Sequence, residues 1–233
     1  MARLPRLYAP NTPQLIQARL ARPLAGTHEA TPAAALDQVQ GWLVTEARCP
    51  PVALHSWAIL PDRVVLLATP ADAQALPRLV QGLARQLATH MSPGRVFNER
   101  YHSALVADDW LPACMVWTES LPVRHGLVDT PTRWPWSSAQ EHTGLRDPGG
   151  LTDHPAYWGM GNTPFARQAH YQQLLQSGLS QKENKEIEQA LRGQWALGHQ
   201  DFLAQLVLQG ARRPHPVSRG RPRKQHDSNL VTK

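Results

Sequence analysis

Histidine and tyrosine are the residue types of this chain best suited to chemistry, and their spacing limits what they can do. His55 opens an apolar stretch, a position typical of a packed or capping histidine rather than of a metal ligand. His90, His102 and His125 are scattered, without the close spacing of a metal site. Tyr101 needs an activating group to become a nucleophile, and the sequence predicts no metal ligands to provide one.

The basic residues give a clearer signal, because the whole net charge of +6 lies at one end of the chain. Residues 211–233 hold seven Lys or Arg against one acid, which leaves the rest of the chain with 17 bases and 17 acids. Such asymmetry predicts a polyanionic partner bound by an arm. Arginine greatly outnumbers lysine, which favours bidentate contacts with phosphate or guanine.

Gly220-Arg221-Pro222-Arg223 lies within this arm and is similar to the core of a minor-groove-binding hook. Proline keeps the backbone extended, so that both arginines can lie along a narrow A·T-rich groove. The alternative is a polybasic tail that binds DNA without sequence preference and in a salt-dependent way.

The elements that would position any site form an alternating series. An apolar run at 53–60, the turn signal Pro61-Asp62 and a β-branched run at 63–68 predict a hairpin. Around it we expect a first strand near the N-terminus, helices at 32–45, 72–89 and 110–120, and a strand at 98–106. For the helix at 110–120 we expect a cap at Asp108-Asp109. This order predicts an α+β sandwich, with helices against an antiparallel sheet.

A second region begins near residue 129, and we divide the chain into 1–128, 129–210 and 211–233. The middle part has helical patterns at 165–175, 183–191 and 201–209, and we expect the last part to be disordered. Trp134 and Trp136 are expected either to plug the space between the domains or to stack on bases. We expect no membrane span, since no run of 18 apolar residues occurs, and no signal peptide, so that the protein stays in the cytoplasm.

Two stretches resemble the active-site halves of one enzyme family. His55–Leu67, HSWAILPDRVVLL, resembles the metal-binding strand of the REP-associated tyrosine transposases, a single-tyrosine HUH family of bacteria. Cys114–Val128, CMVWTESLPVRHGLV, resembles the helix that carries their nucleophile. Further matches follow in the family's order, among them WPWSS at 134–138, TPFARQAHYQQLL at 163–175, WALGHQDF at 195–202 and GRPRK at 220–224. Residues 2–10, ARLPRLYAP, resemble the family's entry into its N-terminal strand, whereas residues 18–34 depart from the pattern.

At the catalytic positions of that family this chain has other residues. The family has His-hydrophobic-His after Met-Pro-Asn, whereas Leu60-Pro61-Asp62 precedes Arg63, Val64 and Val65 here. The nucleophile motif Tyr-x-x-x-Asn-Pro-Val-Arg is reduced to Pro-Val-Arg at 122–124, with Trp117 at the tyrosine position and Leu121 at the asparagine position.

These replacements remove the chemistry that the resemblance would imply. The family's histidine pair holds Mg²⁺ or Mn²⁺ against the scissile phosphate, but neither Arg63 nor Val65 offers a lone pair, so we expect no metal or other cofactor. Arg63 could contact a phosphate in the cation's place, or be a solvated strand-end residue. The indole of Trp117 cannot form a phosphotyrosine bond, although it could pack on the sheet or stack on a base. Glu119, a lone carboxylate, is expected to be solvated.

The resemblance implies a ferredoxin-like, HUH transposase-like sandwich and a transposase-derived DNA-binding protein. We expect it to be catalytically inactive and to bind palindromic or hairpin repeats near the nucleoid. The alternatives are an active transposase or single-strand nuclease with relocated catalytic residues, Tyr101 first, and a decayed copy without a role. The oligomeric state is left open. The expected DNA contacts are Arg63, Arg95, Arg100, Arg124, Arg212, Arg213, Arg219, Arg221, Arg223 and Lys224.

Overall fold

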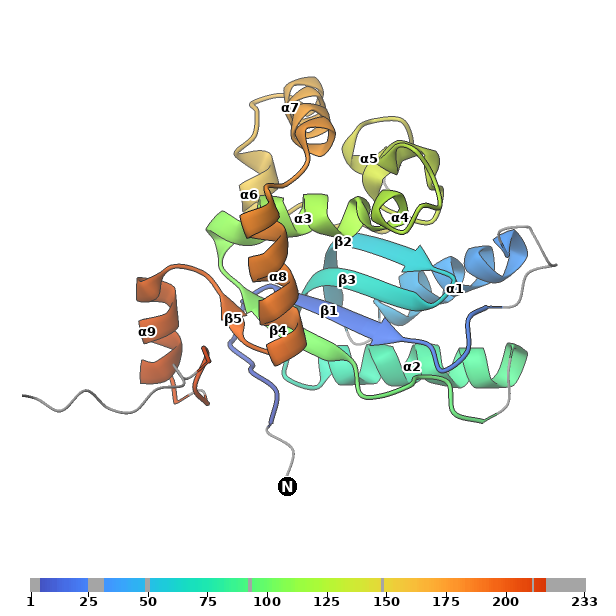
Figure 1. Cartoon of the computed structure of the whole chain (residues 1–233), viewed down its shortest axis with the longest axis horizontal. Helices are drawn as coiled ribbons and strands as arrows, with labels where there is room; N and C mark the ends of the chain where they lie inside the picture. Colours follow the sequence, from blue (N-terminus) through green and yellow to red (C-terminus); the bar gives the residue numbers. More distant parts are fainter. Residues whose placement is uncertain are drawn as a thin grey trace, which may run out of the picture.

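A central sheet with helices on both faces organises the protein (Figure 1). The computed structural model describes residues 5–24, 32–48, 51–91, 94–147, 149–210 and 212–216. In this part of the chain the strands are β1 Gln14–Arg19, β2 Val52–Leu60, β3 Arg63–Pro70, β4 His102–Val106 and β5 Ala196–Leu197. They lie in the order β2-β3-β1-β4-β5.

The first four strands and two helices form a ferredoxin-like unit. Helix α1 (Ala33–Glu46) connects β1 to β2, and helix α2 (Ala75–His90) connects β3 to β4. The resulting β-α-β-β-α-β order, with neighbouring strands antiparallel, confirms the predicted α+β sandwich. One pairing departs from the predicted antiparallel sheet. The short strand β5 pairs with β4 in parallel, after the chain has returned from the C-terminal helices.

Alternate residues of each strand face two separate hydrophobic cores. Ile16 and Leu66 point toward α1 and α2, whereas Leu15 and Val65 point toward the opposite face. That opposite face is covered by α3 (Leu111–Glu119) and α8 (Gln181–Gly193). Because both faces are buried, the strands read as nearly continuous apolar runs in the sequence.

Most of the C-terminal helices complete the second core, but the last, α9 (Gln200–Leu208), packs in a small third cluster with Leu7, Leu105 and Ala196. Tyr157, Tyr171, Ile187 and Leu191 pack in the same cluster as residues of α3 and the sheet. The remaining elements are the 3₁₀ turns Asp108–Trp110 and Pro131–Arg133 and the helices α4 Leu121–Arg124, α5 Ala139–His142, α6 Pro155–Trp158, α7 Pro164–Ser177 and α9 Gln200–Leu208. The division after residue 128 stays a prediction.

The structure corrects two strand boundaries and one cap. The first strand is Gln14–Arg19 rather than 2–10, and the last strand of the unit begins at His102 rather than at 98. Pro5, Pro10 and Pro13 lack the N–H that a strand must donate, which explains the coil at 5–13. Asp108 and Asp109 form a 3₁₀ turn before α3 and make no side-chain cap.

Both tryptophans of the Trp-Pro-Trp sequence are buried against the first core. The indole N–H of Trp134 donates to the carbonyl of Ile59 at 2.9 Å, and that of Trp136 donates to Asp37 at 2.8 Å. They therefore fix the chain after α4 to the edge of the sheet and are not placed to stack on bases. Of the helices in the described residues, none combines the length and the apolar character that crossing a bilayer requires.

A β-bulge in β2 sets which way its side chains face. The pairing register of β2 with β3 shifts between Leu54 and Ser56, so that His55 is the extra residue. Beyond the bulge, Trp57 joins the first core, as Leu54 does, and Ser56 faces Glu119 on the other side of the sheet.

His55 is a packed histidine, as the sequence predicted. It is almost fully buried, and its Nδ1 donates to the carbonyl of Thr152 at 2.7 Å while Nε2 accepts from the Thr69 hydroxyl at 2.8 Å. Nδ1 can donate in either protonation state, whereas Nε2 can accept only in the neutral ring. Burial lowers the pKa of His55 to about 4, and the nearby His154 and His142 lower it further, while the hydrogen bond to Thr152 and the charge of Asp153 raise it by less.

We expect His55 to make the protein less stable in acid. Its pKa is lower in the folded state than in the unfolded chain, so its full stabilisation is present above pH 6.5 and is lost as the pH falls toward 4. The shift corresponds to about 3 kcal/mol at most. Urea unfolding at pH 8 and pH 4.5 measures how much free energy of unfolding is lost in acid. This loss should be smaller for His55→Gln than for the wild type. His215→Gln, at an exposed position, should match the wild type. Equal losses in all three proteins would contradict the prediction.

Candidate functional site

A basic cavity of about 540 Å³ opens on the sheet face covered by α3 and α8. Arginines reach it from four elements: Arg19 of β1, Arg63 of β3, Arg124 of α4 and Arg192 of α8. The other lining residues are Gln17, Glu99, His102, Trp117, Leu121, His125, Glu188 and Leu191. Four arginines against two glutamates give this cavity a positive field, within a chain body that is formally neutral.

Strand register explains why these residues meet. Arg19 lies opposite Arg63, Gln17 lies opposite Val65, and Gln17 also lies opposite His102 on its other side. Since cross-strand partners share a face, the rows at Arg63 and Val65 both point toward α3 and α8. Arg63, from the stretch His55–Leu67, and Trp117, from the stretch Cys114–Val128, thus line one cavity. Val65 is fully buried and does not line it.

Arg63 is not a solvated strand-end residue. Its side chain is 13 % exposed and makes a two-pronged contact with Asp62, with NH2 at 2.6 Å and Nε at 3.0 Å from the carboxylate oxygens. Burial alone would raise the pKa of Asp62, but hydrogen bonds and the charge of Arg63 outweigh burial and lower it. Asp62 therefore stays ionised and fixes the direction of the guanidinium.

Trp117 and Arg124 form the wall at one side of the cavity. The guanidinium carbon of Arg124 lies 4.8 Å from the centre of the Trp117 ring, a cation–π contact. Arg124 also donates to Asn184 Oδ1 at 2.6 Å and lies 3.4 Å from Glu188, both on α8. The buried indole N–H of Trp117 has no hydrogen-bond partner among the described residues. A buried donor without an acceptor costs roughly 1–3 kcal/mol.

His125 adds a group whose charge depends on pH. Burial, and next the charge of Arg63, lower the pKa of His125, which keeps the ring neutral at pH 7. His102 lies 3.4 Å from Glu99 at the opposite side of the cavity. At neutral pH the arginines thus carry the positive charge of the cavity.

The comparisons with known proteins find distant likeness among solved structures. No protein-family model matches the chain, and no curated protein matches it. Among solved structures, the chain is similar to a REP-associated tyrosine transposase bound to a REP hairpin. The identity is 16 % and the TM-score 0.49, over 67 % of this chain and 96 % of that one.

The predicted DNA contacts do not all meet at the basic cavity. Arg95 bonds to the carbonyls of Phe97 and Asn98 and lines a hollow beside α1 and α2, on the other face of the sheet. Arg100 lines another hollow, next to the start of α2. Arg212 donates to the carbonyls of Pro5 and Gln194, which ties the chain after α9 to the body, and Arg213 is exposed. Arg219, Arg221, Arg223 and Lys224 lie outside the described residues.

A metal site has no support from the described residues, in which no group of three or more His, Cys, Asp or Glu is placed to hold an ion. All four tyrosines belong to this part of the chain, and none of them lines the basic cavity. Tyr101 packs in the first core, under the guanidinium of Arg6, and burial raises its pKa. Tyr157 and Tyr171 are buried in the second core, where burial raises their pKa values as well.

Glu119 is the residue that sequence reasoning judged wrongly. It is fully buried, not solvated, and four side chains surround its carboxylate. Ser56 and Ser138 donate to Oε1 at 3.2 and 2.5 Å, His142 Nδ1 lies 2.6 Å from the same oxygen, and Tyr171 donates to Oε2 at 2.7 Å. These partners come from β2, the start of α5, α5 itself and α7. No local pattern marks them, because they are up to 63 residues away in sequence.

This cluster holds the wall of the cavity. Glu119 is the last residue of α3, two positions after Trp117 and directly before α4, which carries Arg124. Fixing its carboxylate to the sheet and to α5 and α7 therefore fixes both wall residues.

We expect the loss of this carboxylate to be severe. Glu119→Ala removes the shared acceptor of four buried side chains and should lower the free energy of unfolding by about 3–5 kcal/mol. Tyr171→Phe removes one donor and should cost about 2 kcal/mol. Glu186→Ala, a partly exposed position on α8, should stay within about 0.5 kcal/mol of the wild type. Urea unfolding measures all three, and a loss for Glu119→Ala no larger than that of Glu186→Ala would refute the role of the cluster.

Proposed function

We propose that the protein binds DNA through the basic cavity and holds its phosphate backbone there without cutting it. The observation that carries the proposal is the convergence of Arg19, Arg63, Arg124 and Arg192 on one cavity. Guanidinium groups bind phosphate oxygens through paired, charge-assisted hydrogen bonds. A cavity lined by four of them suits a polyanion.

The four arginines divide into two kinds. Arg63 and Arg124 are held in place by Asp62, Asn184 and Glu188, so they give the cavity its shape. Arg19 and Arg192 are exposed, and their side chains form no hydrogen bond or ion pair with other described residues. Their donors remain available for a ligand, which supports a role in direct phosphate contacts.

The proposed target is palindromic or hairpin repeat DNA. The support comes from the two stretches that resemble the active-site halves of REP-associated transposases, because residues of both, Arg63 from one and Trp117 and Arg124 from the other, line the same cavity. A family that acts on such repeats provides a reason to test hairpins before other DNA.

The proposed absence of cutting rests on the same positions. Trp117 has an indole where a phosphotyrosine mechanism needs a hydroxyl, and Val65 has no donor atom for a metal. The four tyrosines lie away from the cavity, which gives a relocated nucleophile no support. The site would keep the backbone arrangement of the transposase site, and arginine side chains would bind the phosphate where the enzyme uses a metal ion.

The cavity is tested by a matched pair of double variants. Arg19→Ala with Arg192→Ala should weaken binding of a labelled REP-type hairpin by about tenfold or more and lower the salt slope by about two. Arg78→Ala with Arg85→Ala removes the same charge from the exposed face of α2, across the sheet, and should change affinity by less than about threefold. Fluorescence anisotropy at several salt concentrations, with a scrambled control DNA, measures both.

Two outcomes would overturn the proposal. Equal losses in the two double variants would show that overall charge, not the cavity, binds DNA. A cleaved hairpin, or a covalent protein–DNA band on a denaturing gel with Mg²⁺ or Mn²⁺, would show that the protein cuts. In that case Tyr101 is the first residue to replace.

We also propose that the arm adds contacts in the minor groove through Arg221 and Arg223. Ending the chain at Pro216 should weaken binding to A·T-rich duplexes more than to G·C-rich duplexes, because the narrow A·T groove attracts arginine most strongly. The same anisotropy measurement checks this. A uniform loss on both duplexes would identify the arm as a nonspecific polybasic tail.

A further inference from the structure

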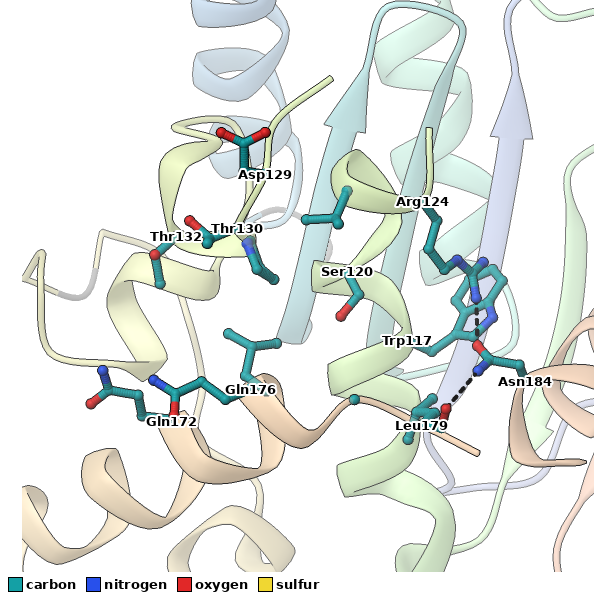
Figure 2. Close-up of a pocket in the computed structure, with 14 residues that line it drawn as sticks. Trp117, Ser120, Arg124, Asp129, Thr130, Thr132, Gln172, Gln176, Leu179 and Asn184 are labelled. Carbon is teal, nitrogen blue, oxygen red and sulfur yellow. Dashed lines mark hydrogen bonds between the residues drawn. The ribbon is translucent and has the colours of Figure 1, made fainter. Parts of the chain in front are cut away.

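A second cavity, of about 470 Å³, lies on the other side of Trp117 and Arg124 (Figure 2). Its walls come from α3 and α4, from the segment 129–132, and from α7 and the start of α8. Trp117, Val123, Leu175 and Leu179 give it apolar surface. We refer to it as the interhelical cavity.

The polar groups of the interhelical cavity are mostly neutral and unused. Ser120, Thr130, Gln172 and Gln176 line it, and their side chains make no hydrogen bond to other described residues. Figure 2 shows the exception, in which Asn184 accepts from Arg124 and donates to the carbonyl of Leu179 at 3.1 Å. Hydroxyl and amide groups offer both donors and acceptors, which suits a flat ligand with both kinds of polar atom along its edge.

The charges near this cavity distinguish it from the basic cavity. Asp129 is its one lining carboxylate in the described part of the chain, and it is paired with Arg133 at 2.9 Å. Arg124 is its one lining cation, and its guanidinium is bound to Asn184 and Trp117. The basic cavity is charged and the interhelical cavity is close to neutral, yet they share Trp117 and Arg124 as common walls.

We infer that the interhelical cavity takes an unpaired nucleobase of a DNA strand whose phosphate lies in the basic cavity. A nucleotide joins an anion to a flat, neutral group with donors and acceptors on its edge, which matches the two cavities in order. Glutamine amides pair well with base edges, and apolar and aromatic walls accept base faces. The inference rests on the proposed DNA binding, and it adds that a single-stranded part of the hairpin is recognised by its base.

Filling the cavity tests this. Gln176→Trp places a large side chain in the lining of the cavity, and Gln173→Trp places the same side chain on the exposed surface of α7, outside the lining. The DNA is a REP-type hairpin with a single-stranded extension, in which each unpaired nucleotide in turn is replaced by an abasic one. We expect one abasic position to weaken binding to the wild type and to Gln173→Trp by about tenfold or more.

For Gln176→Trp we expect weaker binding to the intact hairpin and no further loss from that abasic position, because both changes remove the same contact. Sensitivity to the abasic position that is unchanged in Gln176→Trp would overturn the inference. The inference would also be overturned if no abasic position weakened binding to the wild type. If the arginine double variant still lost affinity in that case, the proposed function would remain intact.

A second measurement does not depend on hairpin binding. Saturation-transfer NMR with the four deoxynucleoside 5′-monophosphates should show contacts to base protons in the wild type and in Gln173→Trp, and not in Gln176→Trp. Deoxyribose 5-phosphate, which has no base, should show none. Base contacts equal in all three proteins, or absent in all, would overturn the inference. Matching thermal melts of the two tryptophan variants exclude unfolding as the cause.

Discussion

The carboxylate of Glu119 is the interaction on which the arrangement of the rest depends. A buried carboxylate costs several kcal/mol unless its oxygens are fully paired, so its four partners must all be in place at once. These partners come from the sheet, α5 and α7. Because they all bind the Glu119 carboxylate, they set how the C-terminal helices pack on the second core. The bulge at His55 is part of the same constraint, since it turns Ser56 toward the carboxylate.

Both cavities follow from that packing. The helix end at Glu119 carries Trp117 before it and Arg124 after it, and these two side chains separate the basic cavity from the interhelical one. Helix α8 closes the basic cavity from the other side with Arg192 and holds Arg124 through Asn184 and Glu188. A site formed by β1, β3, α4 and α8 therefore exists only while the C-terminal helices stay on the sheet.

The features that the sequence predicts depend on residues close together in the chain, whereas the features that it does not predict depend on residues far apart in the chain. The hairpin at Pro61-Asp62, the helices at 33–46 and 75–90 and the helices of the C-terminal part follow from local periodicity, and the structure has them. Strand β1 was misplaced, since nothing local contradicts a strand at 2–10 except its prolines. Glu119 was misjudged because a carboxylate next to polar neighbours in sequence reads as exposed, whereas its partners are brought to it by the fold.

The distribution of charge shows most clearly the difference between what the sequence predicts and what only the fold decides. The sequence by itself determined the alternating order of strands and helices, and the basic composition of the arm. It also determined that residues 1–210 are formally neutral, which conceals any local field. Only the tertiary structure decided that Arg19, Arg63, Arg124 and Arg192 share one cavity, and that Arg95 and Arg100 lie elsewhere. The physical reason is that Coulomb fields depend on distance in space, and these four residues are separated by up to 173 positions in the chain but brought together by strand register and helix packing.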